Sequence, residues 1–256
     1  MRLDLEQTLA AADARRLDPA LARRLIGLID LTSLTGDETP DAITDLARDA
    51  VDHGVAALCI LPAALATAAP ILAGSPVRLA TVANFPHGGD DLARAADEVA
   101  AAVALGADEV DVVAPLEAAL AGDVGLAGEL VELCRAAAGP ETTLKLILET
   151  GRLERPELIT AVGRSAVMAG IDFLKTSTGK TAVGATPEAV ALLLRVAEEA
   201  GGRVGVKVSG GVRTAGEALR YLHLAETVMG PDWPDPAHFR LGASRLLADL
   251  AGRAAS

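Results

Sequence analysis

Short apolar runs of strand-forming composition alternate with longer Ala- and Leu-rich segments along the whole chain. The short runs have the length of buried strands, and the longer segments have the length and composition of helices. Strands separated by helices pair in parallel through crossover connections. Eight such units in 256 residues predict a TIM (β/α)8 barrel. The predicted strands lie at 27–31, 56–61, 78–84, 109–114, 143–149, 171–176, 203–208 and 239–242.

The chain shows no internal boundary that would divide this pattern. It contains no linker, low-complexity tract or block of like charge, so residues 1–256 are predicted to form one domain. Two short helices, at about 3–13 and 17–26, precede the first strand and form an extension, 1–26, packed on the barrel. Thr39-Pro40 and Thr186-Pro187 each place a capping hydroxyl before a proline and predict helix starts. A doubly wound open sheet is the alternative, but no GxGxxG motif follows the first strand.

Composition excludes several classes of partner. The net charge is −12 and no basic run is present, which disfavours binding to DNA, RNA or anionic membranes. No apolar stretch reaches the roughly 20 residues that span a bilayer, and the charged N-terminus does not resemble a secretory signal. Cys59 and Cys134 match no disulfide or zinc pattern and are interpreted as buried free thiols. These features predict a cytoplasmic protein.

The use of lysine is the strongest chemical signal. The chain has four lysines, all between positions 145 and 207, and every other basic side chain is an arginine. Arginine supplies a permanent charge but cannot act as an amine nucleophile. Keeping lysine in this region alone indicates a need for a primary amine, which is typical of carbonyl chemistry through a Schiff base. The four are Lys145, Lys175, Lys180 and Lys207.

Two of these lysines occupy equivalent places near the ends of neighbouring strands. Lys175 in the sixth strand and Lys207 in the seventh would both point into the barrel. Adjacent strands lie about 4.8 Å apart, so the two lysines would be close neighbours. Like charges suppress each other's protonation, so one lysine is predicted to be the nucleophile and the other its perturber. Asp111, in the fourth strand, is a candidate proton relay, and Lys145, in the fifth, would extend the same cluster towards the substrate. Lysines reaching out to solvent, and an aspartate held by a backbone amide or arginine, are the structural alternatives.

Polar residues and glycines at strand ends indicate a phosphorylated substrate. Asp30 closes the first strand, where its carboxylate could accept hydrogen bonds from a polyol. Glycines after the last barrel strands expose backbone amides, and helix N-termini favour an anion there. His87 follows the third strand and could line the site, but no histidine pair has metal-ligand spacing. The candidate phosphate contacts are Gly179, Lys180, Gly210, Gly211, Gly242 and Ser244.

Six segments together resemble a known family, the deoxyribose-phosphate aldolases, which are class I aldolases on a TIM barrel. They occur in order from the first predicted strand to the eighth, so the resemblance covers nearly the whole chain. The segments at 173–180 and 207–213 are the most specific. The six are 29–32 (IDLT), 84–88 (NFPHG), 107–113 (ADEVDVV), 173–180 (FLKTSTGK), 207–213 (KVSGGVR) and 241–244 (LGAS).

The resemblance implies reversible cleavage of 2-deoxy-D-ribose 5-phosphate into D-glyceraldehyde 3-phosphate and acetaldehyde. It assigns Lys175 as the Schiff-base lysine, Lys207 as the group that lowers its pKa, and Asp111 as the proton relay. The phosphate contacts of the family fall on the six residues named above. Such enzymes need no metal or organic cofactor, because the iminium is itself the electron sink, and family membership suggests a homodimer.

The chain departs from the family at two places. Some members end in a tyrosine that donates a proton, whereas this sequence ends at 251–256 (AGRAAS) without one. Some have two serines after the eighth strand, where this chain has Ser244-Arg245; an inward Arg245 would strengthen phosphate binding or change substrate preference. Two functional alternatives remain: a Schiff-base aldolase for another phosphorylated aldol, and a sugar-phosphate-binding barrel without catalysis.

Overall fold

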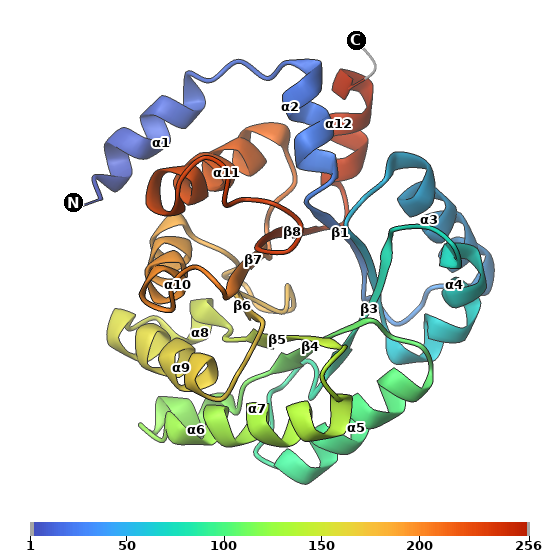
Figure 1. The fold of residues 1–256 in the computed structure, drawn as a ribbon, viewed down its shortest axis with the longest axis vertical. Coiled ribbons are helices and arrows are strands. Elements are labelled where there is room, and N and C mark those ends of the chain that lie inside the picture. Colours follow the sequence, from blue (N-terminus) through green and yellow to red (C-terminus); the bar gives the residue numbers. More distant parts are fainter. Residues whose placement is uncertain (1–2, 255–256) are drawn as a thin grey trace.

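Eight parallel strands form a closed barrel in which each strand pairs with its neighbours in sequence and β1 pairs with β8 (Figure 1). This computed structural model describes residues 3–254, so the predictions for residues 1–2 and 255–256 lie outside the described residues. The closed barrel confirms the TIM fold, and the open-sheet alternative is wrong because β1 leaves no free edge beside β8. The strands are β1 (Ile29–Ser33), β2 (Ala57–Ile60), β3 (Arg78–Ala83), β4 (Glu109–Val113), β5 (Thr143–Ile147), β6 (Phe173–Lys175), β7 (Gly205–Ser209) and β8 (Phe239–Ala243).

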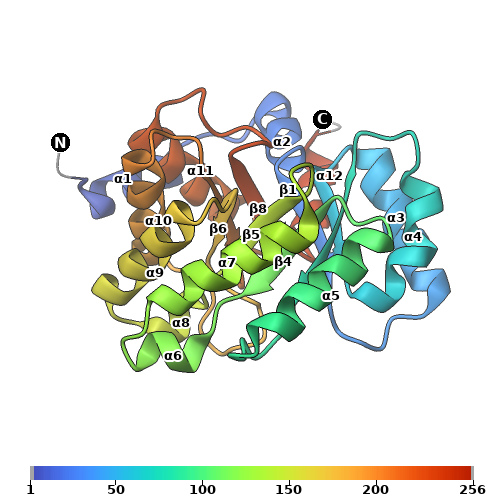
Figure 2. The ribbon, with the colours of Figure 1, turned by 60° about the horizontal axis from the view of Figure 1, so that its bottom comes forward.

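Helices surround the barrel on all sides, as the second view shows (Figure 2). The predicted starts at Thr39 and Thr186 are confirmed, because each hydroxyl accepts a hydrogen bond from the backbone N–H of the third residue of its helix. The helices are α1 (Leu5–Asp13), α2 (Pro19–Ile26), α3 (Pro40–His53), the 3-10 turn η1 (Pro62–Ala64), α4 (Leu65–Leu72), α5 (Leu92–Ala104), α6 (Leu116–Leu120), α7 (Gly125–Ala138), α8 (Thr150–Leu153), α9 (Pro156–Met168), α10 (Pro187–Glu199), α11 (Ala215–Met229) and α12 (Leu246–Ala254).

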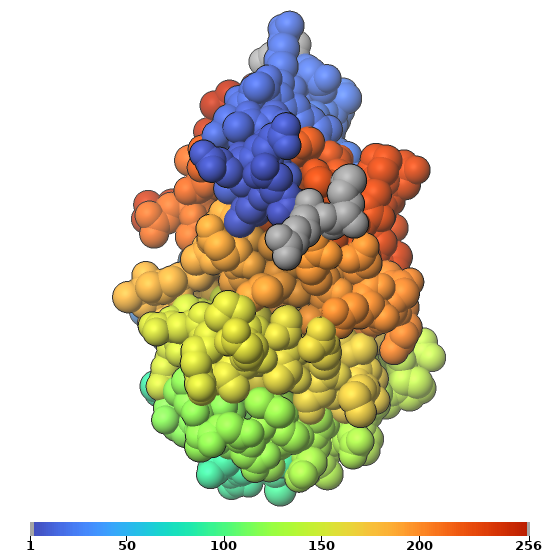
Figure 3. Space-filling model, turned by 90° about the vertical axis from the view of Figure 1, so that its left-hand side faces the viewer, coloured from blue at the N-terminus to red at the C-terminus, as the bar shows by residue number. Residues whose placement is uncertain are grey.

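The N-terminal helices lie outside the ring of βα units. Helix α1 packs against α11, and α2 packs against α12. In Figure 3 the N-terminal segment covers the outer surface beside the orange and red segments of the chain. Arg24 and Arg15 both donate hydrogen bonds to Glu226 of α11, at 2.5 and 2.6 Å, and so attach this segment to the barrel.

The predicted strand boundaries differ from the observed ones by one or two residues at most ends. The first strand begins at Ile29 rather than at 27, because Gly27 caps α2. The seventh begins at Gly205, after Gly201 and Gly202 adopt positive φ angles that end the preceding helix. Apolar residues extend into the loops on both sides of a strand, so hydropathy alone cannot fix where backbone pairing starts.

The strands bury two different faces. Their outward side chains, such as Leu58 and Val110, join one large apolar core between the barrel and the helices. Their inward side chains form smaller groups, because the barrel interior is narrow. On β2 and β3 the inward residues are Ala57, Cys59, Ala80 and Val82, which we call the apolar wall.

Candidate active site

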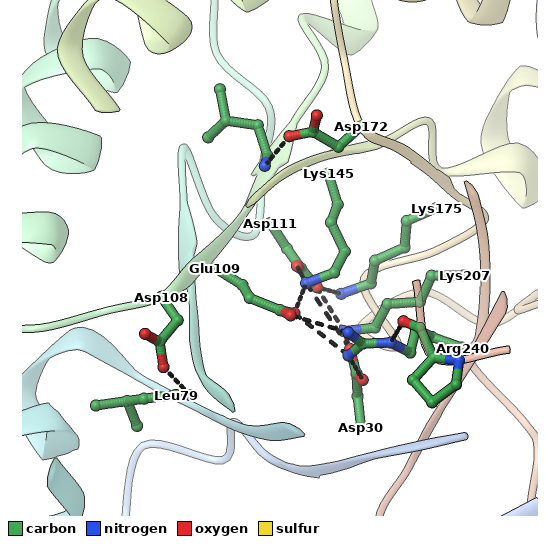
Figure 4. Close-up of polar contacts among 12 residues, drawn as sticks. Asp30, Leu79, Asp108, Glu109, Asp111, Lys145, Asp172, Lys175, Lys207 and Arg240 are labelled. Atoms are coloured by element: carbon green, nitrogen blue, oxygen red, sulfur yellow. Dashed lines mark hydrogen bonds and ion pairs between the residues drawn. The ribbon is translucent and has the colours of Figure 1, made fainter. Parts of the chain in front are cut away.

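Three of the four lysines point into the barrel from adjacent strands (Figure 4). Lys145 on β5, Lys175 on β6 and Lys207 on β7 are each 2% exposed or less. Lys175 and Lys207 are direct partners in the pairing of β6 with β7, as the equivalent positions predict. Lys180 lies in the loop after β6 and is exposed. The alternative in which the two strand lysines reach out to solvent is therefore wrong.

Asp111 connects the three lysines. Its Oδ1 accepts a hydrogen bond from Lys145 Nζ at 2.8 Å, and its Oδ2 accepts from Lys175 Nζ and Lys207 Nζ, each at 2.7 Å. Burial would raise the pKa of Asp111, but its three lysine neighbours, Lys145 most strongly, outweigh burial and hold that pKa well below its usual value. Asp111 is thus a charged carboxylate that contacts both members of the lysine pair.

A second layer of ion pairs lies beneath Asp111. Asp30 Oδ2 lies 2.6 Å from Lys207 Nζ, and Glu109 Oε2 accepts a hydrogen bond from Lys145 Nζ at 2.5 Å. Arg240 on β8 joins the two acids, donating to Asp30 Oδ1 at 2.7 Å and to Glu109 Oε1 at 2.9 Å. These ion pairs and those of Asp111 join seven buried residues, which we call the charged cluster: Asp30, Glu109, Asp111, Lys145, Lys175, Lys207 and Arg240.

The charged cluster contains three acidic and four basic side chains, so the bases outnumber the acids by one. Among the described residues, one carboxylate, Asp111, lies within ion-pair distance of Lys175, whereas Lys207 pairs with both Asp111 and Asp30. Burial and the charge of Lys207 lower the pKa of Lys175, and Asp111 only partly opposes them. For Lys207 burial acts in the same direction, but Asp111 and Asp30 outweigh it and raise the pKa well above its usual value. Of the lysine pair, Lys175 is therefore the member whose neutral form is favoured.

A pocket of about 260 Å³ opens above the lysine pair at the carboxyl ends of the strands. Lys175 and Lys207 reach its floor, and the side chains of Thr32 and Ser209 line it. All six predicted phosphate contacts lie around it, with Arg213 as an additional cation beside Lys180. The six are Gly179, Lys180, Gly210, Gly211, Gly242 and Ser244.

Two of these glycines are required by close approach. A Cβ at Gly242 would lie 2.9 Å from Ser209 Cβ and 3.1 Å from Lys207 Cε, so the glycine leaves room for both side chains. Gly210 has a φ angle of +84°, and its Cβ would lie 2.9 Å from the backbone of Gly184 in the loop after β6. The first glycine opens the floor of the pocket, and the second lets two loops meet at its rim.

Several residues lie outside the predicted substrate pocket, and two residues of the charged cluster were not predicted. Asp30 and Lys145 do not line the pocket: both are fully buried in the charged cluster, where Asp30 is held by Arg240 instead of being free for a polyol. His87 and Arg245 are exposed and lie outside the pocket lining. Sequence reasoning missed Arg240 and its partner Glu109. Alternation along β4 and β8 could have found them, since both occupy inward positions next to Asp111 and Gly242.

Both cysteines are buried free thiols, as predicted. Cys59 belongs to the apolar wall, and burial raises the pKa of its thiol despite nearby Lys207. Cys134 lies on α7, and burial raises its pKa to about 12. Both thiols are therefore protonated near neutral pH.

Residues 3–254 contain neither a metal-binding cluster nor a membrane-spanning helix. Within this range no group of three or more His, Cys, Asp or Glu side chains is arranged to hold a metal ion. No helix of the described chain combines the length and the apolar composition needed to cross a membrane.

The fold and the buried lysines define a class of protein: a TIM barrel with an amine at the carboxyl ends of its strands. The sequence profile of the DeoC/LacD family aldolases matches residues 24–249. The chain belongs to this family and is an aldolase, a lyase acting on carbon–carbon bonds.

Solved structures agree with this assignment. A protein of Coccidioides immitis, named provisionally as a deoxyribose-phosphate aldolase, is 26% identical with a TM-score of 0.80, covering 98% of each chain. A Toxoplasma gondii protein with the same provisional name is 25% identical with a TM-score of 0.83, over 93% of this chain and 95% of that one. The tetrameric deoxyribose phosphate aldolase of Aeropyrum pernix is 26% identical with a TM-score of 0.77, over 96% and 97% of the two chains.

Proposed function

We propose that this aldolase reversibly cleaves 2-deoxy-D-ribose 5-phosphate to D-glyceraldehyde 3-phosphate and acetaldehyde through a Schiff base on Lys175. The observation that carries the proposal is the asymmetry of the lysine pair. Lys175 is a buried amine of lowered pKa at the pocket floor, beside a Lys207 that stays charged. The names of the related structures support the choice of substrate.

The chemistry follows from these positions. Neutral Lys175 adds to the C1 aldehyde, and loss of water gives an iminium. Asp111, acting with Lys207, takes the proton of the C3 hydroxyl as the C2–C3 bond breaks, which releases glyceraldehyde 3-phosphate. The bonding electrons form an enamine on Lys175. Protonation at C2 and addition of water then release acetaldehyde and restore the free amine.

The phosphate is assigned to the rim of the pocket. Gly179, Gly210 and Gly211 have positive φ angles, which bring backbone close to a ligand. Lys180 and Arg213 supply positive charge there, and α12 begins at Leu246, two residues after Ser244. An anion held at the rim would keep C1 of the sugar above Lys175, and such positioning contributes several kcal/mol to the rate.

The decisive experiment is trapping with acetaldehyde and sodium borohydride, followed by intact mass and peptide mapping. We expect one ethyl group, confined to Lys175, and none in the matched Lys175→Arg variant. An adduct on Lys207 would reverse the roles of the pair. No adduct in a protein that still binds inorganic phosphate would overturn the proposal in favour of another donor or a non-catalytic barrel.

The assembly and location of the chain are also proposals. We expect a homodimer that acts in the cytoplasm on a small phosphorylated sugar, without a cofactor. The Aeropyrum pernix relative is described as tetrameric. Light scattering at micromolar concentration distinguishes the two assemblies.

A further inference from the structure

Glu149 follows β5 and has an unusual combination of properties. It is fully buried, although it carries a carboxylate. Its φ angle is +51°, in the left-handed region that non-glycine residues seldom adopt. It does not line the pocket, and no basic side chain of residues 3–254 forms an ion pair with it. A strained, buried acid of this kind persists only when surrounding contacts hold it in place.

The hydrogen bonds of its carboxylate all run to the loop 176–186, which connects β6 with α10. Glu149 Oε2 accepts hydrogen bonds from the amide of Thr178, at 3.1 Å, and from its hydroxyl. Glu149 Oε1 accepts from the Thr181 hydroxyl at 3.0 Å. The Thr178 hydroxyl in turn accepts the amide of Lys180 at 3.0 Å. One carboxylate therefore holds both ends of the 178–181 turn, between which Gly179 and Lys180 lie.

The far side of the same loop is fixed by backbone contacts. The amide of Ala185 donates to the carbonyl of Gly210 at 2.9 Å. At the near side, Gly151 approaches Val183 so closely that a Cβ would lie 2.3 Å from its carbonyl oxygen. The loop is thus held from β5 on one side and from β7 on the other. Glu149 is the acidic side chain in this attachment.

We propose that Glu149 is a positioning residue for the phosphate of the substrate, because it fixes the turn that carries Gly179 and Lys180 to the pocket rim. The proposal rests on the proposed function, since it assumes that the anion binds there. Under this proposal, two functions at the carboxyl ends of the strands belong to different residues. The charged cluster sets the protonation of the amine, whereas Glu149 sets the geometry of the anion site.

Two variants that replace the carboxylate of Glu149 with an amide separate the effect of side-chain length from the effect of the acidic group. Glu149→Gln keeps the length of the side chain: its oxygen can still accept from Thr178, and its NH2 can donate to the Thr181 hydroxyl, which also bonds to Val183. Glu149→Asn is equally neutral and tolerates a positive φ, but it is one methylene too short. We expect Asn to raise the KM for 2-deoxy-D-ribose 5-phosphate about tenfold, which corresponds to about 1.4 kcal/mol. The kcat of the Asn variant should change less than twofold. Both KM and kcat of the Gln variant should stay within twofold of the values for the unsubstituted enzyme.

The second substrate is 2-deoxy-D-ribose, which lacks the phosphate. We expect its kcat/KM to be the same, within twofold, in all three proteins, because nothing in it uses the anion site. Equal losses on both substrates, or an unchanged KM in the Asn variant, would overturn the proposal. If Asn does not fold, Thr181→Val removes one of the three hydrogen bonds from outside the pocket and should raise the KM for the phosphorylated sugar about threefold.

Two measurements do not depend on turnover. Amide hydrogen exchange over 176–186 should be faster in the Asn variant and unchanged in the Gln variant. The affinity for inorganic phosphate, measured by calorimetry, should fall about tenfold in Asn alone. If the unchanged protein cleaves neither sugar, the proposed function fails, yet these two results still decide whether Glu149 builds an anion site. Equal exchange and equal phosphate affinity in both variants would reject that role.

Discussion

The two sides of the barrel interior are built on opposite principles, although their outer faces are alike. On β2 and β3 the inward positions hold the apolar wall, whose members are small and uncharged. On the remaining strands they include every member of the charged cluster, together with an apolar residue, Phe173, whose ring lies against Lys145 and Arg240. Outward residues such as Leu58 and Val112 are equally apolar on both sides and share one core with the helices.

This contrast shows which part of the molecule maintains the fold. The outer core supplies the hydrophobic stabilisation on both sides of the barrel. The charged side chains lose their hydration on burial, and their mutual attraction offsets that loss. Buried ion pairs often contribute no more stability than apolar side chains of similar volume would. We therefore attribute the charges to the chemistry proposed for Lys175 rather than to stability. The comparison also assigns each side a different response to substitution.

The largest expected effect on turnover comes from replacing Lys175. Lys175→Met and Lys175→Arg should both lose turnover, on the order of 10⁴-fold or more, because neither side chain can form a Schiff base. Their stabilities should differ. Met leaves the three-to-three charge balance intact, whereas Arg adds a permanent buried cation and should lower the free energy of unfolding by about 2 kcal/mol or more relative to Met. Urea denaturation measures this difference, and an Arg variant as stable as Met would contradict the charge balance.

A second pair of substitutions should move the amine in opposite directions. Arg240→Met removes a cation, so it should raise the pKa of Lys175 and shift the acidic limb of the activity profile to higher pH. Glu109→Gln removes an anion and should shift that limb to lower pH. Each breaks buried pairs and should cost about 3–5 kcal/mol of stability. The pH dependence of borohydride trapping gives the measurement; shifts in the same direction would show that the effect is structural.

The smallest effect is expected on the apolar wall. Cys59→Ala removes one buried sulfur atom and should cost about 1 kcal/mol of stability. It should leave kcat and KM unchanged, because burial raises the pKa of the thiol and only a thiolate is nucleophilic. Thermal unfolding and steady-state kinetics test both parts. A marked loss of rate would mean that the apolar wall takes part in the chemistry after all.

Local sequence patterns determined much of this protein. The alternation of strands and helices predicted the eight-stranded barrel. The Thr-Pro pairs at 39–40 and 186–187 located two helix starts within a residue. Two-residue periodicity along β6 and β7 placed Lys175 and Lys207 side by side inside the barrel, as the strand pairing confirms. These features depend on spacing within a few residues, which the sequence contains directly.

Tertiary structure alone decided how deep each inward residue lies and what it contacts. The stagger between strands places Asp30 below the pocket against Arg240, although it ends a strand by sequence. The same stagger brings Glu109 and Arg240 together across 131 positions of the chain. Glu149 meets Thr178 because two loops converge after separate strands close the barrel. Such contacts depend on the tilt and registration of the whole barrel, which no local periodicity specifies.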